Sequence, residues 1–128
     1  MNSQKNPQVS VIVVNYNHKY FPRMCVEALE KSEVDFDFEI IVVDDGSHDE
    51  SLDFLKQAHK DGRIQLIESG SNLGYGQGNN LGVEHAKGKY VLIANPDVFV
   101  KEDSLQKMFD YMEKNEDVGV LGPKLMYY

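Results

Sequence analysis

Short apolar runs rich in β-branched residues recur along this chain, and they constrain its fold more than any other feature. The first two occupy residues 9–14 and 39–43, and they contain almost no charge. Such runs are typical of strands that are buried on both faces, as they are in a parallel sheet. Two further strands are expected at residues 63–68 and 89–94.

The stretches between these runs carry apolar residues at helical spacing. We expect helices at residues 21–32, after Ser47 (with Leu52, Leu55 and Ala58 on one face), at 79–87 and at 103–115. This alternation predicts an α/β fold with a mostly parallel sheet of order about 3-2-1-4, right-handed crossovers and helices on both faces.

A fifth strand is expected to begin at residues 118–121, after which the chain stops on apolar, strand-forming residues. This ending favours a sheet that continues in a longer protein. An unfinished sheet would expose an apolar edge, so we also expect self-association through the C-terminal edge.

Length and composition indicate one soluble domain, residues 9–128, preceded by a flexible N-terminus at residues 1–8. The net charge of -8 argues against nucleic acid or an anionic membrane as the main partner. The single cysteine, Cys25, excludes an intrachain disulfide and fits a reducing compartment, where we expect it to be a small core residue. With no membrane-length apolar run or signal-peptide core, the chain is predicted to be cytoplasmic.

Polar residues and glycines follow three of the predicted strands. They are Asn15-Tyr16-Asn17, Asp44-Asp45-Gly46-Ser47 and Asn95-Pro96-Asp97, and the glycine-rich loop 72–80 is expected beside them. In an open parallel sheet, ligands bind beyond the carboxyl ends of the strands, where the strand order reverses. We therefore interpret this rim as a binding site.

The segment after the second strand has structural and functional interpretations. Ser47 with Glu50 matches a capping box, which favours a helix start, and Gly46 suits a backbone turn. Of Asp44 and Asp45, we expect one to support the turn and the other to face the site. A free carboxylate there could accept a hydrogen bond from the imide N–H of uracil or thymine.

The other two rim segments suit a diphosphate and a metal ion. A glycine-rich loop that opens a helix can bring backbone N–H groups close to a diphosphate. Asp97 is the best metal candidate, because Mg²⁺ takes one or two carboxylates and completes its shell with phosphates and water. His18 lies near the rim without an evident partner, and no nucleophilic triad is identifiable.

Four segments together resemble the family-2 glycosyltransferases, inverting enzymes of the GT-A fold. They are residues 9–17, 41–47, 72–82 and 94–98, in the order and at the spacing of that family. The Asn-Pro-Asp turn with the Gly-Tyr-Gly loop is most similar to the rhamnosyltransferase-like branch, which builds bacterial surface polysaccharides.

The resemblance implies that the chain is the N-terminal, nucleotide-sugar-binding half of such an enzyme. Asp45 would contact the base, Tyr16 would lie by the base or ribose, and Asp97 would bind Mg²⁺ or Mn²⁺, with Asn95 replacing the first acid of an Asp-x-Asp motif. The expected substrate-binding residues are Asn15, Tyr16, Asn17, Asp44, Asp45, Gly74, Gly76, Asn80 and Asn95. The family's catalytic base would lie beyond Tyr128, so no catalytic residue is assigned and this chain alone is expected to be inactive.

The implied reaction transfers a sugar from a UDP- or dTDP-type donor to an acceptor hydroxyl with inversion. The acceptor would be a glycan or a lipid-linked glycan, and the full-length protein would be cytoplasmic or peripheral at the inner membrane. One alternative is a non-catalytic nucleotide-binding or interaction module complete at residue 128. A nucleotidyltransferase would need a basic glycine-rich signature near the N-terminus, which residues 9–17 lack.

Overall fold

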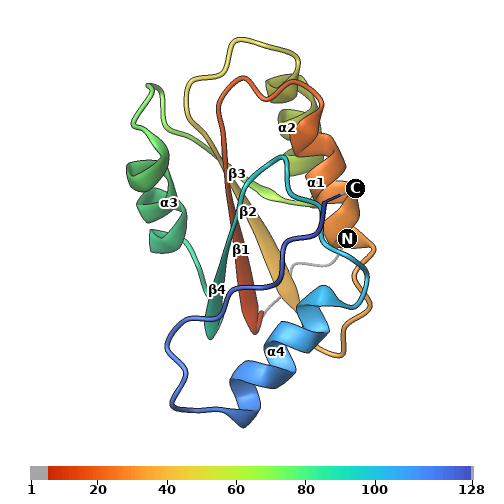
Figure 1. Cartoon of the computed structure of the whole chain (residues 1–128). Helices are drawn as coiled ribbons and strands as arrows, with labels where there is room; N and C mark the ends of the chain where they lie inside the picture. The colour runs from red at the N-terminus through yellow and green to blue at the C-terminus, as the bar shows by residue number, and fades with distance from the viewer. Residues whose placement is uncertain (1–5, 128) are drawn as a thin grey trace.

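Strands and helices alternate strictly along the chain in the computed structural model, which describes residues 6–127. The elements are β1 (Val9–Asn15), α1 (Phe21–Glu30), β2 (Phe38–Asp44), α2 (Ser51–Lys60), β3 (Gln65–Glu68), α3 (Tyr75–Glu84), β4 (Tyr90–Ala94) and α4 (Ser104–Lys114) (Figure 1). The third helix begins four residues earlier than residue 79, because Gly74 ends the loop at φ +88° and accepts the first helical hydrogen bond from Gly78.

All strand pairs in the described residues are parallel, and the sheet order is β3-β2-β1-β4, as predicted. Val11 of β1 lies opposite Ile40 of β2 on one side and Leu92 of β4 on the other. The same register sets Asn15 opposite Asp44, so the polar residues that end β1 and β2 meet at one edge of the sheet.

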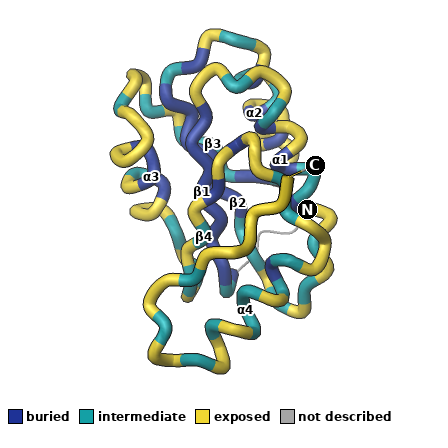
Figure 2. Tube along the Cα trace, in the orientation of Figure 1, coloured by how far each residue is buried: buried dark blue, intermediate teal, exposed yellow. Residues whose placement is uncertain are grey.

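One face of the sheet packs against α1, α2 and α4 and forms the main core. Val11 and Val13 of β1 meet Cys25 of α1, Leu55 of α2 and Leu105 of α4 there. Strand β1 is buried along its whole length, and β2 is buried from Ile40 to Asp44 (Figure 2). Full burial of a side chain such as Leu55 contributes about 2 kcal/mol to folding. The expectation that Cys25 is a core residue is confirmed.

The opposite face of the sheet is covered by α3, which approaches β1 closely. A Cβ atom on Gly82 would lie 2.5 Å from Cγ2 of Ile12, and one on Gly78 would lie 2.9 Å from Cγ1 of Val14. These two glycines therefore let the helix pack directly on the sheet, and they are packing residues rather than parts of the rim.

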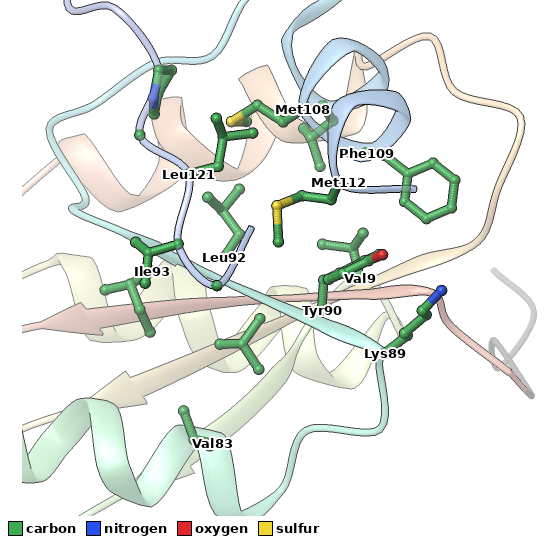
Figure 3. Close-up of a pocket in the computed structure, with 16 residues that line it drawn as sticks. Val9, Val83, Lys89, Tyr90, Leu92, Ile93, Met108, Phe109, Met112 and Leu121 are labelled. Carbon is green, nitrogen blue, oxygen red and sulfur yellow. The ribbon is translucent and has the colours of Figure 1, made fainter. Parts of the chain in front are cut away.

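The outer edge of β4 borders an apolar groove of about 700 Å³ (Figure 3). Val91 and Ile93 are 43% and 44% exposed, because α3 packs mainly on β1 and β2 on their face of the sheet. The groove also lies against Met108, Phe109 and Met112 of α4 and against residues 119–123. None of the rim residues predicted from the sequence lines it.

The prediction of a fifth strand beginning at residues 118–121 is wrong within the described part of the chain. Residues 115–127 form no strand there, and Val120 is 91% exposed. A strand needs a partner for its backbone N–H and C=O groups, and the groove separates this segment from the edge of β4.

Of the residues expected to be flexible, 1–5 lie outside the described part of the chain. Gln8 makes two backbone hydrogen bonds, donating to Asp37 (2.7 Å) and accepting from Tyr90 (3.0 Å). Among the helices of residues 6–127, none has both the length and the hydrophobicity needed to cross a membrane.

Candidate functional site

Asn15 and Asp44 end their strands as a buried polar pair. The Asn15 amide nitrogen lies 3.0 Å from Oδ1 of Asp44, 3.1 Å from Oγ of Ser47 and 2.9 Å from Oγ of Ser51. Oδ2 of Asp44 accepts a further hydrogen bond of 3.0 Å from the backbone N–H of Ser47. Both side chains are 2% exposed or less, so they hold the turn after β2 against β1 instead of presenting polar atoms to solvent.

The start of α2 differs from the capping box expected from Ser47 and Glu50, and that prediction is wrong. The helix begins at Ser51, and Oγ of Ser47 accepts hydrogen bonds from the Asn15 amide and from the backbone N–H of Asn17. The N-cap residue Glu50 makes no side-chain capping hydrogen bond, and Asp49 before it accepts hydrogen bonds from the backbone N–H of Ser51 (3.1 Å) and from its hydroxyl. Slight burial opposes ionisation of Asp49, but the hydrogen bonds from Ser51 and Lys19 outweigh it and lower the pKa of this carboxyl.

The carboxylate of Asp45 holds the glycine-rich loop. Its Oδ1 accepts hydrogen bonds from Oγ of Ser69 (3.0 Å) and the backbone N–H of Leu73 (2.8 Å), and its Oδ2 accepts one from the N–H of Gly74 (2.9 Å). Asp45 is 1% exposed and Asp44 is 2% exposed. The expectation that one of the two acids is free to face the site is therefore wrong, because the loop backbone already occupies it. The expected turn role of Gly46 is confirmed by its φ of +88°.

The loop that Asp45 anchors leads into an open helix end. Virtual Cβ atoms on Gly74 and Gly76 would meet no atom within 4 Å, so another molecule could approach the backbone closely there. No side chain of the described residues caps the N-terminus of α3. The N–H groups of its first turn can therefore bind a negatively charged group.

A pocket of about 350 Å³ opens at the rim where the strand order reverses between β1 and β4. Its lining comes from the end of β1, the loop that follows, the first residue of α3 and the turn after β4: Val14, His18, Tyr75, Asn95, Pro96 and Asp97. The structure thus brings Asn95 and Asp97 together, as expected. His18 and Tyr75 were not among the predicted site residues, and the only signal for His18 was its position three residues after β1.

The Asn95–Asp97 turn rests on the N-terminal part of α1. The backbone carbonyl of Asn95 lies 3.8 Å from Sγ of Cys25 and accepts a hydrogen bond of 3.1 Å from the N–H of Val98. Burial raises the pKa of the Cys25 thiol to about 12, and the negative charge of Asp97 adds to this effect. Asp97 itself is exposed at the pocket.

The pocket suits a cation that shares its ligands with phosphate groups. No cluster of three or more His, Cys, Asp or Glu side chains able to hold a metal exists among residues 6–127. Asp97 contributes one carboxylate and Asn95 one amide oxygen at the same pocket. Mg²⁺ or Mn²⁺ fits such a set when phosphates and water complete the coordination, whereas a structural zinc site does not.

Three other predicted binding residues lie outside the pocket lining. Tyr16, Asn17 and Asn80 are exposed, and Tyr16 retains 42% of its surface. The side-chain oxygen of Asn17 accepts a hydrogen bond of 2.7 Å from the backbone N–H of His48, which joins the loop after β1 to the segment before α2. Tyr16 is left as an exposed aromatic ring directly after β1.

Sequence comparison matches residues 10–127 to the family model described as glycosyl transferase family 2. An uncharacterized glycosyltransferase of Methanocaldococcus jannaschii is 36% identical over 118 residues, which are 90% of this chain and 40% of that protein. The glycosyltransferase GlyG of Streptococcus pneumoniae is 32% identical, over 89% of this chain and 38% of its own length. The chain thus spans about two fifths of the length of these two relatives.

Solved structures share the fold. S. aureus TarS 1-349 in complex with UDP-GlcNAc superposes with a TM-score of 0.75 at 26% identity, over 85% of this chain and 32% of that chain. A mannosyltransferase of Pyrobaculum calidifontis, in complex with GDP-Man and Mn²⁺, has a TM-score of 0.73 at 24% identity, over 84% of this chain and 32% of that chain. The second likeness concerns the fold alone.

Proposed function

The chain belongs to glycosyl transferase family 2, and from that premise we propose that it is the donor-binding part of a sugar transferase. The proposed donor is a nucleoside-diphosphate sugar of the UDP or dTDP type. The proposed reaction moves its sugar to an acceptor hydroxyl with inversion at the sugar carbon. The Asn-Pro-Asp turn and the Gly-Tyr-Gly loop favour a member of the rhamnosyltransferase-like branch.

One observation carries the proposal: Asn95 and Asp97 share a pocket with Tyr75, the first residue of α3, where the strand order reverses. A diphosphate in this pocket would lie between the carboxylate of Asp97 and the first turn of α3. The helix N-terminus favours negative charge, and the open surroundings of Gly74 and Gly76 permit a close approach.

The nucleoside would lie over Tyr16, near Asn17 and Asn80 and beside the loop that Asp45 holds. TarS, which binds UDP-GlcNAc, supports a donor with a uracil base. An imide N–H of the base could reach Asp45 only if the backbone N–H groups of Leu73 or Gly74 released it. While those N–H groups stay bound to it, Asp45 holds the glycine-rich loop in position. Asn15 and Asp44 hold the turn after β2 in the same way.

We propose Asp97 and Asn95 as the residues that would hold Mg²⁺ or Mn²⁺ together with the donor phosphates. When bound, the cation would offset the negative charge that develops on the departing diphosphate. The contribution of the chain is to orient the diphosphate: the turn at residues 95–97 supplies one wall of the pocket, and Tyr75 supplies another.

We assign no base for the acceptor hydroxyl within residues 6–127. In the transfer, the acceptor oxygen forms the new bond to the sugar carbon, the bond from that carbon to the diphosphate breaks, and the hydroxyl proton passes to a base. We propose bacterial surface polysaccharide synthesis as the process, with a glycan or a lipid-linked glycan as acceptor. The corresponding location is the cytoplasm, peripheral at the inner membrane for a full-length protein.

Isothermal titration of the folded chain with UDP-, dTDP- and GDP-sugars, each with and without Mn²⁺, tests the proposal. We expect binding of a UDP- or dTDP-sugar that becomes much tighter with Mn²⁺. Absence of metal-dependent binding to all three classes would reject the proposal. Binding that ignores the metal would instead favour a non-catalytic nucleotide-binding module.

A further inference from the structure

His18 lies in a loop whose backbone is strained on both sides of it. Asn17 and Lys19 have φ angles of 54° and 55°, in the left-handed region that residues other than glycine seldom adopt. This conformation is unfavourable for residues with a side chain, and it persists only where neighbouring contacts impose it.

Hydrogen bonds fix this loop on both sides of His18. The backbone N–H of Asn17 donates to Oγ of Ser47 (3.0 Å), and that of Lys19 donates to Oδ2 of Asp49 (2.8 Å). The carbonyl of His18 accepts a hydrogen bond from the N–H of Phe21 (3.1 Å). The loop is therefore held against the segment before α2 in one conformation, and that conformation places His18 in the lining of the pocket that also includes Asp97 and Tyr75.

The distribution of charged and basic groups in the pocket suggests a role for His18. Of the six residues that line it, Asp97 is acidic and His18 is the only one with a basic side chain. A nucleoside diphosphate brings two or more negative charges to a site that already holds a carboxylate. One divalent cation does not balance them, so a further hydrogen-bond donor is favoured, and an imidazole has at least one N–H in either protonation state.

We infer that His18 binds the diphosphate of the donor, in the same pocket as the proposed cation site. The inference rests on the proposed function and extends it, because sequence reasoning gave His18 no partner. In this arrangement the strained loop positions the imidazole before the donor arrives. His18 therefore selects nucleoside diphosphates over monophosphates.

The test measures the affinities of UDP and UMP in the presence of Mn²⁺ for the wild type and for three variants. His18→Ala removes the imidazole N–H group. His18→Gln keeps a side-chain N–H group that can donate a hydrogen bond, and His48→Ala is the matched control. His48 is an exposed histidine whose contact with this loop is made by its backbone, which the substitution leaves in place. Thermal denaturation of each variant establishes that it is folded.

We expect His18→Ala to weaken UDP binding about tenfold and UMP binding less, as loss of one charge-assisted hydrogen bond implies. His18→Gln should recover part of the loss, and His48→Ala should match the wild type. The inference is wrong if a folded His18→Ala variant binds UDP with an affinity within twofold of the wild type. It is also wrong if the affinities for UDP and UMP fall by the same factor. If His18→Ala does not fold, His18→Gln decides instead: a folded glutamine variant should lose more affinity for UDP than for UMP, and equal losses would reject the inference.

Failure of the wild type to bind UDP, dTDP or GDP with Mn²⁺ is a different result. It would reject the proposed function, and this inference with it. Wild-type binding with an unchanged His18→Ala variant would reject this inference alone.

Discussion

The carboxylate of Asp45 accepts a hydrogen bond of 2.9 Å from the backbone N–H of Gly74, which joins the turn after β2 to the loop before α3. The two residues are 29 positions apart in the sequence. Their contact determines where the glycine-rich loop lies, and hence where the N-terminus of α3 meets the pocket at Asp97. Asp45, which the sequence pattern assigns to ligand contact, is thus hydrogen-bonded to the protein backbone instead.

Asp45→Asn should lower the free energy of unfolding by about 1–3 kcal/mol, because the new amide cannot accept all three hydrogen bonds and leaves a buried group unsatisfied. Amide hydrogen exchange should also become faster at residues 69–75. Urea denaturation and exchange mass spectrometry check the two effects. Glu84→Gln, at an exposed acid near the end of α3, is the control and should change neither. An unchanged exchange rate in the loop would contradict this role of Asp45.

Asp97→Ala should weaken metal-dependent donor binding at least tenfold, because one carboxylate supplies most of the protein's charge toward the cation. Its exposure predicts that the melting temperature stays within a few degrees of the wild type. Calorimetric titration and thermal denaturation of the same samples measure both properties. Asp117→Ala, at an exposed acid outside the pocket, should leave both unchanged. A large loss of stability in Asp97→Ala would mean that the acid is structural.

Gly82→Ala should destabilise the fold by about 1–3 kcal/mol, because the new methyl group would lie 2.5 Å from Cγ2 of the fully buried Ile12. Gly76→Ala is the matched substitution in the same helix. Its Cβ would meet no atom within 4 Å, and alanine should stabilise the helix by up to about 1 kcal/mol. Chemical denaturation of the pair separates packing from helix propensity. Equal effects of the two substitutions would refute close packing of α3 on β1.

The Cys25 thiol should make stability depend on alkaline pH. Burial, with the charge of Asp97 added to it, raises the pKa of this thiol from 9.0 to about 12. The unfolded chain therefore loses this proton before the folded chain does. The contribution of this thiol to the free energy of unfolding is fully present below pH 9. It falls by up to about 1.4 kcal/mol per pH unit from there towards pH 12.

Cys25→Ala isolates that contribution, since other groups also titrate in the same range. Its stability should fall less steeply than that of the wild type when urea denaturation is compared at pH 8 and pH 10.5. Parallel declines in the two proteins would show that the thiol ionises as easily in the folded chain as in the unfolded one.

The exposed edge of β4 should promote association at high concentration. This strand is uncharged, it is hydrogen-bonded to β1 on one side, and its side chains Val91 and Ile93 are exposed. Ile93→Lys should reduce the apparent mass in concentration-dependent light scattering without lowering the melting temperature. Glu116→Gln changes the net charge by the same amount at an exposed residue outside the groove and is the control. A wild type that stays strictly monomeric at high concentration would contradict this prediction.

The alternation of strands and helices could be predicted because it is a local property. Strands β1 and β2 are mostly apolar and rich in β-branched residues, and apolar side chains recur at helical spacing in α1, α2 and α4. The parallel pairing followed from the alternation of strands and helices with right-handed crossovers. The strand expected from residue 118 failed for the converse reason: strand propensity has no effect where the groove keeps the segment out of hydrogen-bond reach of the edge of β4.

The sequence by itself determined the α/β class, the sheet order and the rim where polar residues gather, since each follows from local pattern and chain geometry. Only the tertiary structure decided what those polar residues do. Asp44 and Asp45 are buried there and accept hydrogen bonds from other segments of the chain. His18 and Tyr75 line the same pocket as Asp97. The physical reason is that a carboxylate binds whichever donors the fold brings within 3 Å, and residues far apart in sequence supply those donors.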